Sequence, residues 1–458
     1  GCFLIFIDRH SGYIVCCVSD NGKVLFNSFH AVYFPFFVVL CIMSTVYTIH
    51  PPQADLLEGV IRLNGSKSIS NRVLIIDALC GHQIALENLS NADDTVFLQR
   101  LLASEDTVLD AGAGGTTYRF LTAFLATQEG REVVLTGSER MQQRPIRILV
   151  DALRQLGADI SYENEEHFPP LRIKGKKLKG GKVELPADTS SQYITALLLI
   201  APTLSEGLEL HLTGTIVSVP YIRMTLKIME YFGVKTAFEG NVIRIPHAKY
   251  QPRPFFVEGD WSAASYFYSI AILSKESELT LEGLTAQQIQ GDSVIADIAR
   301  HFGVETTHHE KSVTLSKKAV AQIPAHLTFD FLECPDLAQT VLAFCAALKV
   351  QLQCHGLQTL RIKETDRIAA MDTELRRLGL AALTEINDNR WDLQYPETVV
   401  GKSSDTPIHT YEDHRMAMAI APLAITSGQI KMEEPMVVTK SYPLFWADLE
   451  KLGFGIIR

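Results

Sequence analysis

Apolar and polar positions repeat along this chain in one order: a helix with an apolar face, a glycine, and a strand in which apolar and polar residues alternate. Helices commonly close on a residue in the left-handed backbone region, where glycine avoids a side-chain penalty. Five such glycines follow one another at intervals of 76, 70, 76 and 74 residues, which indicates a repeated structural unit. They are Gly157, Gly233, Gly303, Gly379 and Gly453.

A second series of positions marks where helices begin. Six times, a short stretch of small or polar residues precedes an apolar helix, as is typical of helix N-termini and their capping residues. Five of these openings precede the closing glycine of their unit by 39 to 43 residues, whereas the first unit has residues 101–104 where its glycine would stand. The openings lie at residues 65–68, 114–117, 189–192, 259–262, 335–338 and 412–415.

Together the two series predict six units of roughly 70 to 76 residues, each with two helices and intervening strands of the βαβ type. The predicted fold class is therefore α/β. Six units divide into two domains of three, with the Pro-Arg-Pro sequence at 252–254 as the expected break. A strand at 59–63 has no repeat of its own, so we expect it to complete the other domain. The predicted domains are residues 66–257 and residues 43–65 with 258–458.

Helix N-termini suit anions because their unpaired N–H groups carry a partial positive charge. The net charge of −10 argues against a nucleic-acid partner, so any functional cations must be gathered locally. Lysines and arginines do lie at or just beyond the predicted helix openings. If they converge in a cleft, they would bind a substrate with several phosphate or carboxylate groups. These cations are Lys67, Arg72, Arg119, Arg144, Lys363, Arg367, Arg415 and Lys440.

The densest group of charges is Arg-Ile-Lys-Glu-Thr-Asp-Arg at residues 361–367, ahead of a Leu- and Arg-rich stretch that stops at Gly379. We expect a helix that starts near Glu364, which would place Lys363, Glu364 and Arg367 on one surface. One interpretation is a solvated ion-pair cluster. The other is a proton-transferring carboxylate held among cations that bind an anionic substrate.

Other chemistries lack a matching pattern. None of the eight cysteines is in a C-x-x-C pattern, and neither a metal-ligand pair of histidines nor a P-loop stands out, so we expect no metal and no cofactor. The longest early apolar run, 31–43, is too short to span a bilayer. Residues 1–42 fit neither a signal nor a transit peptide, and we expect them to be a non-native extension with Met43 as the start. A reducing cytoplasm suits the cysteines that follow residue 42.

Eight short stretches carry a family likeness. They are 64–72 (NGSKSISNR), 114–119 (GGTTYR), 144–146 (RPI), 190–192 (SSQ), 218–221 (SVPY), 335–336 (PD), 361–367 (RIKETDR) and 413–418 (DHRMAM). In combination they closely resemble the 5-enolpyruvylshikimate-3-phosphate (EPSP) synthase family, collinearly from about Thr45 to the C-terminus. The resemblance implies an enolpyruvyl transferase fold, an inside-out α/β barrel of two domains with three units each, whose helix N-termini face an interdomain cleft.

The resemblance also implies a reaction: the enolpyruvyl group of phosphoenolpyruvate passes to the 5-hydroxyl of shikimate 3-phosphate, and phosphate is released. By position, shikimate 3-phosphate would be bound by Ser68, Arg72, Ser190, Ser191, Gln192, Ser218, Tyr221, Asp336 and Lys363. Phosphoenolpyruvate would be held by Lys67, Gly115, Arg144, Arg367, Arg415 and Lys440. The implied catalytic set is Lys67, Asp336, Glu364, His414 and Lys440. Glu364 would deliver a proton to the methylene carbon while Asp336 takes one from the attacking hydroxyl.

Two positions depart from the family pattern, because Ala113 and Thr359 stand where the family usually has Asn or a similar polar residue. The nearest alternative is the sister enzyme that enolpyruvylates UDP-N-acetylglucosamine. It typically carries a cysteine in the loop at 136–145, where this chain has none. A repeat scaffold that only binds anions or a protein partner is the alternative from another class. We expect a monomer with no nucleic-acid or membrane partner.

Overall fold

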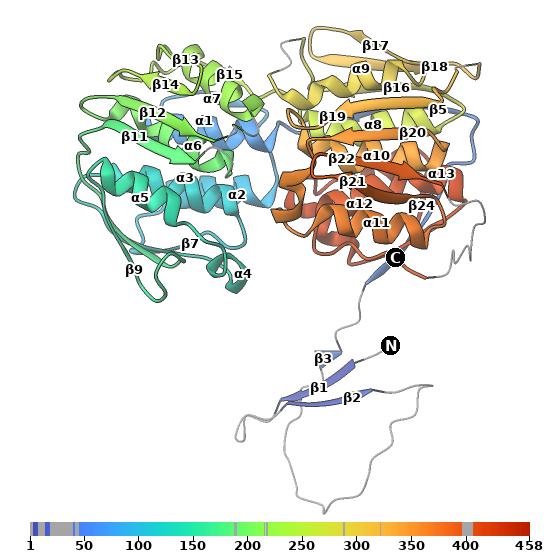
Figure 1. The fold of residues 1–458 in the computed structure, drawn as a ribbon, viewed down its shortest axis with the longest axis horizontal. Coiled ribbons are helices and arrows are strands. Elements are labelled where there is room, and N and C mark those ends of the chain that lie inside the picture. The colour runs from blue at the N-terminus through green and yellow to red at the C-terminus, as the bar shows by residue number, and fades with distance from the viewer. Residues whose placement is uncertain are drawn as a thin grey trace, which may run out of the picture.

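Two α/β bodies make up most of what the computed structural model describes (Figure 1). The described residues are 45–186, 190–214, 216, 219–286, 289–320, 322–395 and 406–458. Nearer the N-terminus only the backbone of three strands is described, and these strands, β1 (Phe3–Ile7), β2 (Ile14–Val18) and β3 (Leu40–Cys41), form a separate sheet. That residues 1–42 are a non-native extension stays a prediction. Within the described residues, no helix has the length and apolar character needed to cross a membrane.

The first body places apolar helices inside and sheets outside. Helix α3 buries every residue except Thr116, as expected for a helix that is apolar nearly all round. Its helices are α1 (Lys67–Leu79), α2 (Asp93–Leu102), α3 (Gly115–Ala126), α4 (Glu139–Gln142), α5 (Arg147–Gln155), α6 (Ser191–Ile200), η1 (Ala201–Thr203) and α7 (Val219–Tyr231). Its strands are β6 (Leu86–Glu87), β7 (Val108–Asp110), β8 (Glu132–Thr136), β9 (Asp159–Tyr162), β10 (Leu171–Lys174), β11 (Gly181–Pro186), β12 (Leu208–Thr213), β13 (Ala237–Glu239), β14 (Val242–Ile245) and β15 (Phe255–Phe256).

The second body repeats this plan around α8, all of whose residues are buried. Its helices are α8 (Trp261–Leu273), η2 (Gly291–Val294), α9 (Ile295–Arg300), η3 (Pro335–Leu337), α10 (Ala338–Leu348), η4 (Gln358–Ile362), α11 (Arg367–Arg377), α12 (His414–Ile420), η5 (Ala421–Leu423), α13 (Ala424–Ser427), η6 (Pro435–Lys440) and α14 (Phe445–Lys451). Its strands are β4 (Val46–His50), β5 (Leu56–Arg62), β16 (Glu276–Glu282), β17 (Val304–His308), β18 (Ser312–Lys317), β19 (His326–Asp330), β20 (Gln351–His355), β21 (Ala382–Asn387), β22 (Arg390–Gln394), β23 (Ile430–Glu433) and β24 (Gly455–Ile457).

Four sheets share one topology, which confirms the predicted repeat and the α/β class. In each sheet a parallel pair of strands continues into two antiparallel pairings. The strand orders are β7-β8-β10-β9, β11-β12-β14-β13, β5-β16-β18-β17 and β19-β20-β22-β21. Each of these units has its own sheet of the same topology. Their helices therefore begin at equivalent places.

The chain passes between the bodies twice. The strand predicted at 59–63 overlaps β5, which pairs with β16 of the second body, and β4 pairs there with β23 and β24. At the crossing, Gly65 and Gly259 form an antiparallel bridge, and a Cβ on Gly65 would lie 1.8 Å from the carbonyl oxygen of Asn88. Only glycine fits such an approach of two backbones. One hydrophobic core uses residues 47–63 and 261–454 and the other uses 69–257. The domain boundaries given above stay a prediction.

The observed helix starts agree with the predicted ones at all six openings. The predicted start of one further helix is wrong. Five openings lead directly into α1, α3, α6, α8 and α12, and the opening at Pro335 leads through η3 into α10. The helix predicted to start near Glu364 begins instead at Arg367, because Asp366 caps it by accepting hydrogen bonds from the N–H groups of Ile368 and Ala369, both at 3.1 Å. Lys363 and Glu364 therefore lie in the turn before α11 and are not on a helix face.

Candidate active site

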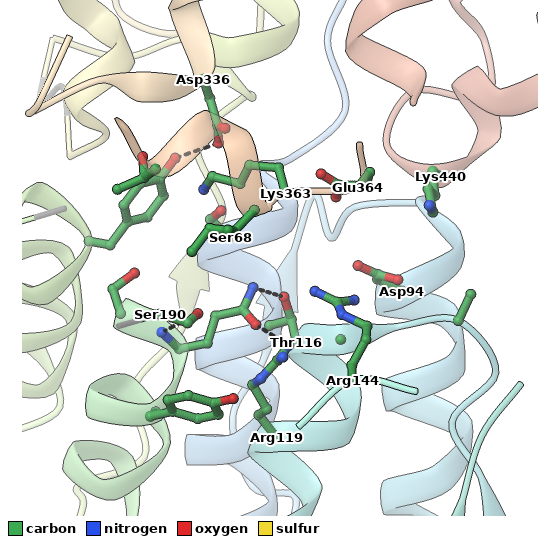
Figure 2. A pocket seen from close by; sticks show the side chains of 18 of the residues that line it. Ser68, Asp94, Thr116, Arg119, Arg144, Ser190, Asp336, Lys363, Glu364 and Lys440 are labelled. Carbon is green, nitrogen blue, oxygen red and sulfur yellow. Dashed lines mark hydrogen bonds between the residues drawn. The ribbon is translucent and has the colours of Figure 1, made fainter. Parts of the chain in front are cut away.

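A cavity of about 700 Å³ lies between the bodies, and Figure 2 shows its charged lining. The first body contributes Lys67, Ser68, Arg72, Gly115, Arg144, Ser190, Ser191, Gln192 and Tyr221. The second contributes Asp336, Lys363, Glu364, Arg367, His414, Arg415 and Lys440. These are all the predicted site residues except Ser218, which lies outside the described residues. Residues up to 373 positions apart in sequence thus share one hollow, as the convergence of helix openings predicts.

Arg367 is the centre of the charged cluster. Its side chain is only 2% exposed, and its guanidinium donates from Nε to Asp413 Oδ2 at 2.6 Å. Nη1 donates to Asp336 Oδ1 at 3.1 Å, and Nη2 donates to Glu364 Oε2 at 2.8 Å. Burial alone would lower the pKa of Arg367, but the three carboxylates together raise it above its usual value. The guanidinium therefore fixes two of the predicted functional acids relative to each other.

Asp336 links the two bodies. Its Oδ2 accepts a hydrogen bond from the Tyr221 hydroxyl at 2.7 Å, across from α7, and lies 3.0 Å from Nη2 of Arg415. Burial would raise the pKa of Asp336, but Arg415, Lys363 and Arg367 hold it well below its usual value. Asp336 is therefore ionised at neutral pH and can accept a hydrogen bond from a substrate hydroxyl.

Glu364 faces the same cavity from the turn before α11. Burial would raise the pKa of its carboxyl group, but Arg367 and, among other groups, Lys67 and Lys363 hold it well below its usual value. At neutral pH this carboxylate is ionised as long as the cations around it keep their full effect. For the predicted role as a proton donor, Glu364 would need anions that offset those cations.

His414 opens α12 as a buried, neutral side chain. It is 2% exposed, and within the described part of the chain neither ring nitrogen has a hydrogen-bond partner. Burial first, and then Lys67 and Arg415, lower the pKa of this imidazole well below its usual value. A neutral ring lines the cavity without adding a positive charge to it.

The lowered pKa of His414 predicts a pH-dependent stability. The unfolded chain binds a proton at this residue below about pH 6.5 while the folded chain does not, so stability falls as the pH falls from there. The contribution reaches at most about 1.4 kcal/mol per pH unit. We expect His414→Gln to lessen the fall in the free energy of unfolding, measured by urea denaturation between about pH 7.5 and 5.5. The exposed control His326→Gln is expected to keep the wild-type slope, and an equal slope in His414→Gln would contradict the prediction.

Residues around the opening of α3 form a second polar cluster. Gln192 accepts from Arg119 Nη1 at 2.7 Å and donates to the Thr116 hydroxyl at 3.0 Å. Gly115 begins α3 between two guanidinium groups, because a Cβ there would lie 2.6 Å from Nη1 of both Arg119 and Arg144. The absence of a side chain at this residue leaves the two arginines room to face the cavity.

Arg72 lines the cavity but uses most of its donors within the protein. It donates to the carbonyl of Ser68 at 2.7 Å, to the hydroxyls of Thr225 at 2.9 Å and Thr195 at 3.2 Å, and to the carbonyl of Tyr221 at 3.3 Å. Burial lowers the pKa of Arg72 to about 10. Its packing role is evident from these bonds, whereas its part in substrate binding stays a prediction.

The two departures from the family pattern also lie in the cavity lining. The Thr359 hydroxyl is buried and has no hydrogen-bond partner among the described residues. Ala113 offers no polar side chain. The described residues contain no group of three or more His, Cys, Asp or Glu side chains that could hold a metal ion.

Some lining residues had no assigned role from sequence, notably Asp94, Arg119 and Arg140. Arg119 was singled out only as one of the cations near a helix opening. Asp94 carried no distinct signal, since acidic residues are ordinary in the first turn of a helix. Arg140 comes from α4, in the loop region where the alternative enzyme would carry a cysteine.

Solved structures share this architecture. Two solved structures of EPSP synthase from Acinetobacter baumannii match with TM-scores of 0.73 and 0.72 at 20% identity, and each match covers 90% of this chain and 100% of the other. At this identity the likeness establishes the fold. With the cation-lined cavity between two bodies of repeated units, it places the protein in the class of enolpyruvyl transferase folds.

Sequence relatives define the family more narrowly. The family profile of EPSP synthase (3-phosphoshikimate 1-carboxyvinyltransferase) matches residues 96–449. A 3-phosphoshikimate 1-carboxyvinyltransferase from Bacteroides fragilis is 48% identical over 403 residues, which cover 87% of this chain and 96% of the relative. Another, from Pasteurella multocida, is 34% identical over 438 residues, which cover 88% of this chain and 97% of the relative. The chain belongs to the EPSP synthase family.

Proposed function

We infer that this protein transfers the enolpyruvyl group of phosphoenolpyruvate to the 5-hydroxyl of shikimate 3-phosphate and releases phosphate. This is the reaction of a 3-phosphoshikimate 1-carboxyvinyltransferase, in the shikimate pathway to aromatic amino acids. The observation that carries the inference is the meeting of cations from both bodies with Asp336 and Glu364 in one cavity. Two polyanionic substrates need such a set of cations, and a proton donor and a proton acceptor must lie within reach of both.

The proposed subsites follow the sides of the cavity. On the α1, α6 and α7 side, Ser68, Ser190, Gln192 and neighbouring groups would bind shikimate 3-phosphate with Asp336 and Lys363. Near the openings of α1 and α3, phosphoenolpyruvate would meet cations from both bodies: Lys67, Arg144, Arg367, Arg415 and Lys440. Substrate binding between the bodies would bring the 5-hydroxyl and the enolpyruvyl carbon together, which removes much of the entropic cost of their reaction.

The two carboxylates would then act in sequence. Glu364 gives a proton to the methylene carbon as the 5-hydroxyl oxygen attacks the adjacent carbon, and Asp336 takes the hydroxyl proton, which leaves a tetrahedral phosphate ketal. Loss of a methyl proton to Glu364 and departure of phosphate restore the double bond. Because Glu364 is ionised among cations in this structure, its protonation depends on substrate anions that offset Arg367 and Lys67.

Gly115→Ala is expected to raise the KM for phosphoenolpyruvate by about tenfold, since small misplacements of binding groups weaken productive binding strongly. The added Cβ would lie 2.6 Å from both Arg119 and Arg144, so both guanidiniums must move. The KM for shikimate 3-phosphate should change less. Gly455→Ala is the matched control, because a Cβ there meets only His50 at 3.5 Å, an ordinary contact distance. An unchanged KM for phosphoenolpyruvate in Gly115→Ala would contradict this assignment.

Steady-state phosphate release tests the function itself. We expect release only when phosphoenolpyruvate and shikimate 3-phosphate are both present. Release with UDP-N-acetylglucosamine but not with shikimate 3-phosphate would instead indicate the sister enzyme, whose cysteine loop is replaced here by residues 136–145. No release with either acceptor would favour a scaffold that only binds anions. We further propose that the protein acts as a monomer. We place it in the cytoplasm, because a reducing environment suits the free thiols of Cys80, Cys334, Cys345 and Cys354.

A further inference from the structure

Asp94 is a carboxylate in the cation-rich part of the cavity that the proposed steps do not use. It lies in the first turn of α2, and its side chain is 13% exposed. Its Oδ2 is 3.4 Å from Nζ of Lys67, at the opening of α1. In Figure 2 the Asp94 carboxylate lies beside Arg144 and beneath Lys440. These three side chains and Lys67 line the same cavity.

The opening of α3 contacts the backbone of Asp94 and leaves space for its carboxylate. The Thr117 hydroxyl of α3 donates to the backbone carbonyl of Asp94 at 2.7 Å. A Cβ on Gly114 would lie 2.9 Å from Asp94 Oδ1, so the glycine before α3 leaves room for the carboxylate. An acidic residue near a helix N-terminus is stabilising in any helix, and the exposed neighbour Asp93 is explained in that way. That effect does not explain the contact with Lys67 or the space at Gly114.

Asp94 carries negative charge at the place where the proposed function puts a substrate phosphate. Burial lowers the pKa of Arg144, and Asp94 is one of the groups that oppose this effect. Like charges repel strongly at short range in a partly buried site, where water screens them poorly. A phosphate bound by Lys67, Arg144 and Lys440 would therefore share its cations with Asp94 and bind less tightly than the cations alone would allow.

We propose that Asp94 is a positioning residue for the transfer, which orients Lys67 against the opening of α3 and limits the affinity of the cavity for the phosphate that is released. This proposal rests on the proposed function, because it assigns the phosphate of phosphoenolpyruvate to the cations around Asp94. It explains why a site that must bind a phosphate ester also contains a fixed carboxylate. Phosphoenolpyruvate also binds through its groups other than the phosphate, whereas free phosphate is bound only by these cations.

The test compares two neutralising substitutions in the same helical turn. Asp94→Asn removes the charge with little change in size, and Asp93→Asn removes an equal charge from the exposed neighbour. Binding of inorganic phosphate is measured by calorimetry with shikimate 3-phosphate present to fill the other anion subsite. We expect the dissociation constant for phosphate to fall about tenfold in Asp94→Asn and to stay near the wild-type value in Asp93→Asn.

Kinetics give a readout that a purely structural role would not produce. Asp94→Asn should show stronger inhibition by phosphate, competitive with phosphoenolpyruvate, together with a lower kcat. A residue that only stabilised α2 would instead weaken the binding of every ligand when it is changed. An unchanged or raised dissociation constant for phosphate in Asp94→Asn would overturn the proposal.

A second variant keeps the proposal testable if Asp94→Asn folds poorly. Gly114→Ala places a Cβ against the carboxylate, so we expect it to shift phosphate binding in the same direction by a smaller factor. A dissociation constant for phosphate in Gly114→Ala that equals the wild-type value, or exceeds it, would contradict the proposal. Failure of the wild type to release phosphate from its two substrates would overturn the proposed function. The comparison of phosphate binding would still decide the role of Asp94.

Discussion

Glu364→Gln is expected to keep both substrates bound while turnover falls by about 10²–10⁴-fold, the range over which general acid catalysis contributes. Glutamine preserves the size of the side chain and can still accept a hydrogen bond from Arg367, which now meets Glu364 Oε2 at 2.8 Å. It cannot deliver a proton to carbon. The loss should therefore appear in kcat, with KM for either substrate changed much less.

Steady-state kinetics and calorimetric titration of each substrate measure the two parts of this prediction. The matched control is Glu385→Gln, which neutralises an exposed carboxylate that pairs with Arg361 outside the catalytic set. It should leave kcat close to the wild-type value, because exposed ion pairs contribute little. A kcat for Glu364→Gln within tenfold of the wild type would rule out the proton-donor role.

Arg367→Met is expected to lower the free energy of unfolding by about 3–5 kcal/mol, as is typical when one partner of a buried ion pair is removed. Asp413 would lose its guanidinium partner in a position with no solvent exposure. Asp336 and Glu364 would lose the cation that now holds them in place, and the pKa of each should rise. We expect kcat/KM to fall by about 10³-fold when it is measured well below the unfolding temperature.

Arg376→Met is the control for this second prediction. Arg376 lies on the same helix, and its ion pair with Asp372 is exposed. Removing it should cost about 1 kcal/mol or less. Denaturant unfolding of the wild type and both variants gives the comparison. A loss in Arg367→Met no larger than that in Arg376→Met would show that the three-carboxylate cluster is not held by this guanidinium.

The helix openings could be predicted because their chemistry is local. Ser66, Ser190, Asp260 and Asp413 cap their helices through their own side chains, and the sequence around each shows a polar residue before an apolar run. The start of α11 was misplaced by three residues for the same kind of reason. Glu364 and Asp366 are both acids before a helix, and only the structure shows that Asp366 makes the capping bonds.

The site was harder to predict wherever a side chain has partners far away in sequence. The sequence indicates a free cation at Arg72. In the structure, however, Arg72 donates hydrogen bonds to Thr195 and Thr225, which are more than 120 positions away. Asp94 gave no signal, because its meaning depends on Lys67 and on the space that Gly114 leaves. The positions of the cations in the sequence thus indicate an anion site. The role of each residue within that site depends on tertiary contacts.

Reaction in deuterium oxide tests the central claim most directly, because it follows the proton that Glu364 is proposed to move. Addition of a solvent-derived deuteron to the methylene carbon, followed by loss of one of three hydrogens, should leave deuterium in the vinyl group of the product. We expect mass spectrometry of the product formed from phosphoenolpyruvate and shikimate 3-phosphate to show this label with the wild-type protein. A vinyl product without deuterium would contradict transfer by protonation and elimination in this cavity.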